Sequence, residues 1–253
     1  MTDIMHRKSS FMRIEGIKAL IFDLGGTLFK PVSDMCSLTR DYLIEIDIDR
    51  RLDFPDSEII NATKGPDEWL ANYMIEKQVG PHWVPSYDDW IEYDRLLLAE
   101  LGIFDIEVVK KYQAKWDEFQ SSAIPELIEG CKECLEKLDN RGFKLGVASN
   151  RFGDPADILK ANSIYHLFDA IEYTNVPGYR KPSPYMLIRI AQQLGINPHK
   201  CAYIGNVVKY DVEAASRAGM LPVLLTWIDP QEADLLTSDT IVVEHIEDLM
   251  EIF

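Results

Sequence analysis

A single aspartate follows an uninterrupted apolar run near the start of the chain. The run Leu20-Ile21-Phe22 leads into Asp23, and a glycine turn then leads to Thr27. An apolar run without polar alternation is typical of a strand covered on both faces, and the ligands of open α/β sheets gather where such strands end. Asp23 therefore has the residue type and the position of a nucleophile or a metal ligand.

Other polar residues follow later apolar segments. Ser149 and Asn150 come directly after the segment 145–148, and Asn206 follows the segment 202–205, with Asp211 further along. Lys181 stands just before a helix whose first turn is set by proline. Since the strands of a parallel sheet end at one edge, we expect these side chains to lie at the same edge as the first aspartate.

The elements that must position these residues alternate regularly in the second half of the chain. The pattern predicts helices and strands in turn, which implies βαβ units and a parallel sheet. The expected helices are 125–140, 154–161, 184–194 and 211–218, the expected strands are 144–148, 170–173, 201–204 and 221–226, and a last strand and helix follow from residue 240.

The segment from Pro31 to Ser122 differs from the rest, because its periodicity is helical and no strong strand pattern occurs in it. Residues 88–101 and 108–119 show this helical spacing most clearly. The segment also carries four of the five tryptophans, at positions 69, 83, 90 and 116. We therefore expect a helical module with an aromatic core of its own.

Composition limits the possible partners and locations. The chain has 253 residues, 47% of them hydrophobic and 27% charged, with a formal net charge of -16. This acidity disfavours a nucleic-acid or anionic membrane partner. No apolar run approaches the roughly 18 residues of a membrane span, and the N-terminal residues lack a secretory pattern, so we expect a cytoplasmic protein.

Cys131 and Cys134 form the only CxxC pair among the four cysteines. They recur at helical spacing with Leu127 and Ile128, so the pattern favours one apolar helix face. No second pair completes a zinc site, and the five histidines are scattered. We interpret this pair as helix packing.

The order and spacing of these motifs resemble the four-motif series of the haloacid dehalogenase superfamily of phosphoryl-transfer enzymes, from about Ile17 to the C-terminus. The resemblance implies an α/β fold, with a Rossmann-like doubly wound parallel sheet core and a helical cap domain. It divides the chain into an N-terminal extension at 1–16, the core at 17–30 and 123–253, and the cap at 31–122.

The same resemblance implies a role for each catalytic position. Asp23 is expected to be the nucleophile that attacks phosphorus. Ser149, less directly Thr27, and the Asn150 amide are expected to hydrogen-bond the transferring group. The Lys181 ammonium is expected to offset charge on the nucleophile and on the phosphoryl oxygens.

A magnesium ion is also implied, held by the Asp23 carboxylate, the Gly25 backbone carbonyl and the fourth-motif residues Asn206 and Asp211. Two of these positions depart from the superfamily pattern. Phosphatase members usually have an acid–base aspartate at the position of Gly25, and such assistance is typically worth about 10²–10⁴-fold. The fourth motif usually begins Gly-Asp, whereas Asn206 offers a neutral oxygen, so we expect weak metal binding.

Three functions remain open at this stage. The first is a phosphatase-type hydrolase of a small phosphorylated metabolite. The second is a branch without the second aspartate: a phosphonate-cleaving enzyme that uses Lys64, which we expect in a surface turn, or a dehalogenase, although Leu187 replaces that branch's tyrosine. The third is a non-catalytic binder of a phosphoryl ligand or a partner protein. The sequence identifies neither the substrate nor the oligomeric state.

Overall fold

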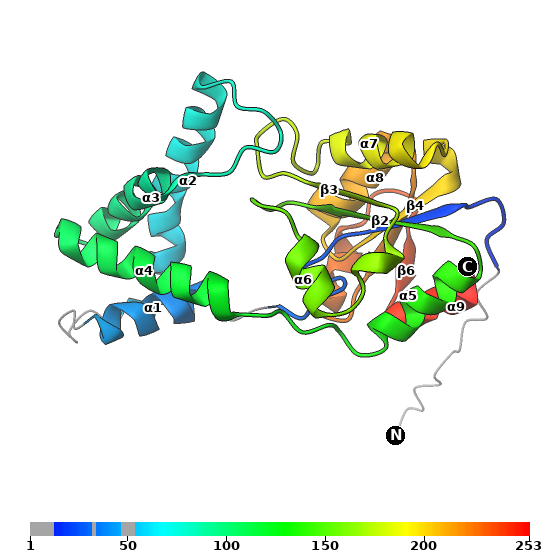
Figure 1. Cartoon of the computed structure of the whole chain (residues 1–253), viewed down its shortest axis with the longest axis horizontal. Coiled ribbons are helices and arrows are strands. Elements are labelled where there is room, and N and C mark those ends of the chain that lie inside the picture. Colours follow the sequence, from blue (N-terminus) through cyan, green and yellow to red (C-terminus); the bar gives the residue numbers. More distant parts are fainter. Residues whose placement is uncertain (1–12, 32–33, 47–53) are drawn as a thin grey trace.

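The computed structural model describes residues 13–31, 34–46 and 54–253, and its centre is a six-stranded sheet (Figure 1). All paired strands run parallel, in the order β3-β2-β1-β4-β5-β6. This is the doubly wound order, which confirms the predicted α/β class. The strands are β1 (Ala19–Phe22), β2 (Lys144–Ser149), β3 (Ala170–Tyr173), β4 (Cys201–Gly205), β5 (Leu221–Leu225) and β6 (Ile241–Val243).

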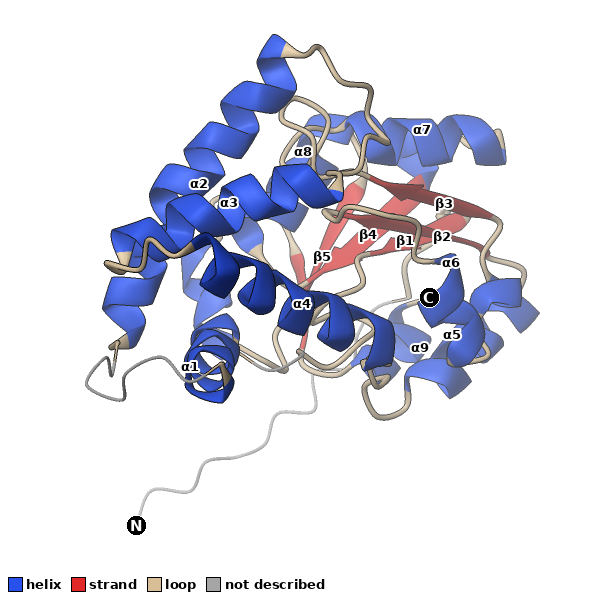
Figure 2. Ribbon diagram, turned by 60° about the vertical axis from the view of Figure 1, so that its left-hand side comes forward, coloured by secondary structure: helices blue, strands red, loops and turns tan. Residues whose placement is uncertain are grey.

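Helices cover both faces of the sheet (Figure 2). One face carries α5 (Cys131–Asn140), α6 (Ala156–Ala161) and α9 (Leu249–Ile252), and the other carries α7 (Tyr185–Leu194) and α8 (Glu213–Ala218). The alternation of side chains along β1 explains this arrangement. Leu20 and Phe22 belong to the first apolar layer, whereas Ala19 and Ile21 belong to the second. The central strand is therefore apolar at every position.

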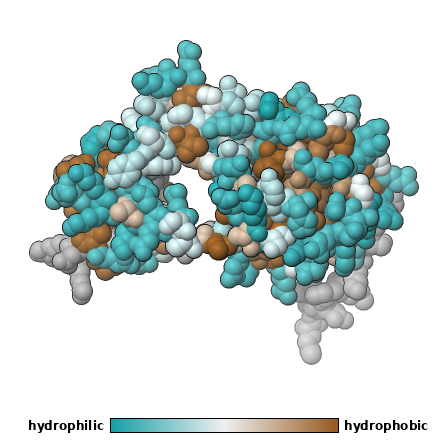
Figure 3. All heavy atoms as spheres, in the orientation of Figure 1, coloured by the Kyte–Doolittle hydropathy of each residue, from teal (hydrophilic) through white to brown (hydrophobic). Residues whose placement is uncertain are grey.

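Among the described residues between β1 and α5, four further helices occur, and we call them the cap helices (Figure 1). Their apolar residues form a separate cluster that includes Ile59, Leu98 and Tyr112. In the space-filling view the cap helices and the sheet region form two lobes (Figure 3). The cap helices are α1 (Met35–Glu45), α2 (Asp56–Glu76), α3 (Tyr87–Glu100) and α4 (Ile106–Ser122). None of the described helices is long and apolar enough to cross a membrane.

The helix α5 begins later than the sequence pattern predicts. Gly130 has a φ of 72°, and the helix starts after it at Cys131. Leu127, predicted to lie on the helix, instead forms an isolated bridge with Phe29. The Ile128 amide donates to the Leu28 carbonyl at 3.0 Å. The prediction failed here because these apolar side chains are buried through pairing with the β1 loop rather than through helix packing.

The surface turn predicted around Lys64 is also wrong, because this residue lies inside α2. Pro66 stands within the same helix and is buried. A helix-interior proline removes a backbone hydrogen bond and normally favours a break. Here Ile59, Leu70 and Met74 continue the buried side of α2 on both sides of the proline. Burial along the whole helix outweighs the local preference for a turn.

The tryptophans of the inserted segment do not form one cap core. Trp116 packs against the cap cluster, as predicted. Trp83 and Trp90, by contrast, meet the ring of Phe152 edge-on, at centroid distances of 6.0 and 5.8 Å. Phe152 follows β2, so these two rings pack where the cap helices contact the sheet region.

Candidate active site

Lys181 joins two aspartates at the carboxyl end of the sheet. Its ammonium lies 2.7 Å from Asp23 Oδ1 and 2.7 Å from Asp211 Oδ1. Lys181, Asp23 and Asp211 are only 3%, 8% and 2% exposed. The structure thus brings together three residues that the sequence analysis selected from distant positions in the chain.

Tyr203 is a further polar contact of Lys181, and no motif in the sequence indicates it. Its hydroxyl oxygen lies 2.8 Å from the Lys181 ammonium and 2.9 Å from the Ala148 carbonyl oxygen. A tyrosine within an apolar strand is usually a core residue, but a buried hydroxyl needs a polar partner. That requirement is the one feature of the sequence that could have indicated Tyr203.

Asp211 is held by the loop after β4. Its Oδ2 accepts hydrogen bonds from the Asn206 and Val207 amides, both at 3.0 Å. A π-helical turn at Val208–Val212 presents it, and α8 starts only afterwards, later than predicted. Gly205 must lack a side chain, because a Cβ there would lie 2.3 Å from Asp211 Cγ.

Asn150 contacts the Lys181 backbone and also lines the cavity beside Gly25. Its Oδ1 accepts from the Lys181 amide at 2.7 Å, and its Nδ2 donates to the Lys181 carbonyl at 3.0 Å. Both polar atoms of the side chain are thereby engaged. These two bonds hold the Lys181 backbone, and the expected contact of Asn150 with the transferring group stays a prediction.

Thr27 and Asn206 link the first and fourth motifs. The Thr27 hydroxyl, fully buried, donates to Asn206 Oδ1 at 3.1 Å. Between them, Gly26 has a φ of 75°, and a Cβ there would lie 2.6 Å from Asn206 Nδ2. The indole of Trp227 donates to the Gly26 carbonyl at 2.7 Å. The turn after Asp23 is therefore fixed on several sides.

A cavity of about 520 Å³ lies beside this turn. Gly25, Ser149 and Asn206 line it together with Arg151. A Cβ placed on Gly25 would find no heavy atom within 4 Å, so the missing side chain leaves open space. Arg151 Nε is buried and has no hydrogen-bond partner among the described residues. The cavity thus combines an available cationic donor with the end of β2.

The charges in the site are unbalanced, with two buried carboxylates against one ammonium. Burial raises the pKa of Asp23 above its ordinary value; Lys181 opposes this shift and Asp211 adds to it. Burial alone lowers the pKa of Lys181, but Asp211 and Asp23 outweigh it and hold that pKa above its usual range. The lysine is therefore a stable cation between the two aspartates.

The donor set near Asp23 fits a hard divalent cation. A carboxylate, an amide oxygen on Asn206 and a backbone carbonyl on Gly25 are oxygen ligands of the kind Mg²⁺ accepts. The Asp211 carboxylate, the remaining expected ligand, is the most heavily engaged of these groups. Both of its oxygens already accept from Lys181 or from the loop amides.

Two residues considered for the alternative chemistries lie away from this group. Lys64 is exposed on α2, and its ammonium contacts Asn61 Oδ1 at 2.6 Å. It does not line the cavity beside Gly25. Leu187 is fully buried in the apolar layer under α7. Neither position supplies the group that the phosphonate-cleaving or dehalogenating chemistry requires.

A buried aspartate and lysine at the carboxyl edge of a doubly wound sheet, with helices inserted after the first strand, define a capped α/β hydrolase. A family model described as haloacid dehalogenase-like hydrolase matches residues 17–219. The chain belongs to this family, as the motifs predicted.

Curated relatives cover most of the chain. Glyceraldehyde 3-phosphate phosphatase of Methanopyrus kandleri is 27% identical over 82% of this chain and 83% of its own length. Phosphoglycolate phosphatase of Aquifex aeolicus is 26% identical over 83% of this chain and 85% of its own. Haloacid dehalogenase-like hydrolase domain-containing protein 3 of Bos taurus is 25% identical over 73% of this chain and 71% of its own.

Solved structures share the fold. A predicted phosphoglycolate phosphatase from Haemophilus somnus superimposes with a TM-score of 0.61 at 20% identity, covering 93% of this chain and 97% of its own. A 2-haloacid dehalogenase from Pseudomonas syringae pv. tomato gives 0.60 at 17% identity, with the same coverage. Because enzymes of two different chemistries match equally well, these superpositions establish the architecture alone.

Proposed function

We propose that the protein is a phosphatase-type hydrolase of a small phosphorylated metabolite, with Asp23 as the nucleophile. The observation that carries this proposal is the Lys181 ammonium fixed at 2.7 Å from the Asp23 carboxylate in a buried site. The names of the Methanopyrus and Aquifex relatives support a phosphomonoester substrate.

In the proposed reaction, an Asp23 oxygen attacks phosphorus and the bond from phosphorus to the leaving oxygen breaks. The product is an aspartyl-phosphate, and water then attacks its phosphorus, which releases phosphate and restores the carboxylate. Lys181 offsets negative charge on the carboxylate and on the phosphoryl oxygens in both steps. Ser149 and Arg151, which line the adjacent cavity, are placed to donate hydrogen bonds to those oxygens.

The leaving oxygen must take up a proton, and Gly25 has no side chain to provide one. We infer that water in the cavity beside Gly25 supplies it, because the cavity has room where the usual aspartate would stand. Loss of a general acid typically costs about 10²–10⁴-fold in rate. We therefore expect the enzyme to turn over slowly.

Magnesium is the proposed cofactor, with the Asp23 carboxylate, the Gly25 carbonyl and Asn206 Oδ1 as ligands. When bound, it would offset charge on the transferring phosphoryl group.

We further propose the domain division into a core at 17–30 and 123–253 and a cap at 31–122, after an extension at 1–16. All four cysteines are free thiols, which supports the proposed cytoplasmic location.

The test is phosphate release from a panel of phosphomonoesters, including phosphoglycolate and glyceraldehyde 3-phosphate, with and without magnesium. Turnover should require the metal and disappear in Asp23→Asn. Asp157→Asn, which alters an exposed carboxylate elsewhere, is the matched control. Absence of turnover in the wild type and in Gly25→Asp with Asn206→Asp would favour a non-catalytic binder. Metal-independent halide release from a 2-haloacid would favour dehalogenation.

A further inference from the structure

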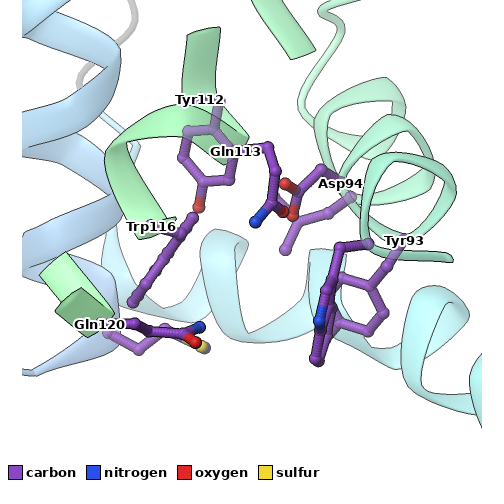
Figure 4. A pocket seen from close by; sticks show the side chains of 9 residues that line it. Tyr93, Asp94, Tyr112, Gln113, Trp116 and Gln120 are labelled. Atoms are coloured by element: carbon purple, nitrogen blue, oxygen red, sulfur yellow. The ribbon is translucent and has the colours of Figure 1, made fainter. Parts of the chain in front are cut away.

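A second cavity, of about 210 Å³, lies inside the cap helices (Figure 4). It is bounded by α3, by α4 and by the first residue of α1, Met35. Aromatic side chains supply much of its wall, namely Trp90 and Tyr93 from α3 and Tyr112 and Trp116 from α4. Nothing in the proposed reaction at Asp23 uses this cavity.

Asp94 is the unusual member of the wall. It is 4% exposed, and its Oδ2 has no hydrogen-bond partner among the described residues. Figure 4 shows its carboxylate directed into the space between α3 and α4, near Gln113. An unpaired buried carboxylate destabilises the folded state, and more so when it is charged. The Asp94 carboxylate therefore lacks a hydrogen-bond donor that a bound ligand could supply.

The polar groups around Asp94 do not meet this need. The Tyr93 hydroxyl donates to Asp67 Oδ1 at 2.8 Å, and the Tyr112 hydroxyl bonds Thr39 Oγ1 at 2.9 Å. The Gln113 amide donates to Asp117 Oδ1 at 2.7 Å. These three donors are therefore directed away from Asp94 Oδ2.

The charges facing Asp94 are negative as well. Burial raises the pKa of Asp94 to about 8, and the charge of Asp117 on α4 adds to the shift. The groups contributed by α3 and by α1 to the wall, Tyr93 and Met35, bring no positive charge. These groups disfavour an anionic ligand, whereas a cation would pair with the ionised Asp94 carboxylate.

The chemistry of the wall selects the kind of cation. Calcium or magnesium needs six or more oxygen ligands, whereas this wall is mainly aromatic. Aromatic faces attract organic ammonium ions and also contact their alkyl groups. We propose that the cap cavity is a binding site for a small alkylammonium ion, whose N–H group donates to Asp94 Oδ2 and whose alkyl part contacts Trp90 and Trp116.

The test is calorimetric titration of the full chain with n-butylammonium chloride in an amine-free buffer. Ionised Asp94 is the form that pairs with the ligand, so binding should be about tenfold tighter at pH 9 than at pH 7. Uncharged n-butanol and anionic n-butyrate should not bind. These comparisons use the wild-type protein, so they do not depend on whether a variant folds.

Asp94→Asn and Asp94→Leu should each abolish the heat of binding. Glu100→Gln, which removes an exposed carboxylate from the same helix, should bind as the wild type does. Equal binding of n-butanol, binding that survives in both Asp94 variants, or no binding at pH 9 would overturn the proposal. Asp23→Asn should leave this binding intact, so the outcome is separate from that of the proposed hydrolysis.

Discussion

Asp211 and Lys181 are buried partners, with the ammonium 2.7 Å from Oδ1 of the carboxylate. The second oxygen of Asp211 accepts from two amides of the loop after β4. One side chain thus fixes both the cation that faces Asp23 and the loop that carries Asn206. We therefore propose that Asp211, expected from the sequence as a metal ligand, acts as a positioning residue for Lys181.

Asp211→Asn should therefore impair catalysis by misplacing Lys181. The substituted amide has one acceptor oxygen, so either the ammonium or the loop amides lose a partner. We expect kcat to fall by about 10²-fold, as for small misplacements of a catalytic group. The free energy of unfolding should fall by about 1–3 kcal/mol. Phosphate release and urea denaturation measure the two effects.

Tyr203→Phe is the matched comparison, since it removes a hydroxyl from the same ammonium and keeps both ion pairs. It should lower kcat less than Asp211→Asn does. If Asp211→Asn raised the magnesium dissociation constant sharply while kcat at saturating metal stayed normal, Asp211 would be a metal ligand after all.

Gly25→Asp should accelerate the reaction. The space beside Gly25 is open, and its φ lies outside the left-handed region, so an aspartate fits without strain. A carboxyl group here would protonate the leaving oxygen, and we expect kcat to rise within the range of about 10²–10⁴-fold that such groups supply. Gly25→Asn has the same shape and cannot transfer a proton, so it should not accelerate the reaction. Equal rates for the two variants would contradict the explanation.

The sequence was sufficient to predict those site residues whose position depends on the order of strands and helices. Asp23 and Lys181 each follow or precede an element that periodicity predicts, Asp211 begins one, and a parallel sheet brings such positions to one edge. Tyr203 was missed because its ring fits an apolar strand, and only the need of its hydroxyl for a partner distinguishes it. The prediction for Lys64 was wrong because the turn preference of the Gly-Pro pair depends on neighbouring residues only. Burial along the whole of α2 outweighs that preference.

Side-chain pairing was the part that could not be predicted. Asn150 lies where the motif required it, yet which atoms its amide contacts depends on the path of the backbone at Lys181. In the same way, nothing in the spacing of α3 and α4 shows that Asp94 is left without a donor. Such contacts depend on loop geometry and on helix rotation, which hydrophobic periodicity does not encode.

Lys181→Met should change how stability depends on pH. In the wild type the pKa of Lys181 is raised, so its contribution is fully present below the ordinary lysine pKa and is lost as pH rises above it. Without the ammonium, Asp23 and Asp211 are two buried carboxylates with no cation. Removing one partner of a buried pair typically costs about 3–5 kcal/mol.

In the Lys181→Met variant, protonation of a carboxyl relieves this repulsion. Its folded-state pKa is raised, so the variant should be most stable near pH 4 and should lose stability as pH rises towards 7. Urea denaturation across this range measures the difference from the wild type. Lys144→Met, at an exposed ion pair, should shift stability little and without this pH dependence. Parallel curves for wild type and Lys181→Met would show that the cluster is not charged as described.

Asp94→Asn should stabilise the protein at alkaline pH. The pKa of Asp94 is about 8 in the folded state because of burial, and about 3.9 in an unfolded chain. Between these values the folded state holds a proton that the unfolded state has released. The contribution of Asp94 therefore falls as pH rises from about 4 to about 8.

The Asp94→Asn variant has no such group, so its stability relative to the wild type should increase over that interval, by on the order of a few kcal/mol. Urea denaturation at pH 5 and pH 8.5 measures this difference, and Glu100→Gln should follow the wild type at both. If the difference between wild type and Asp94→Asn were the same at the two pH values, Asp94 would already have a partner in solution.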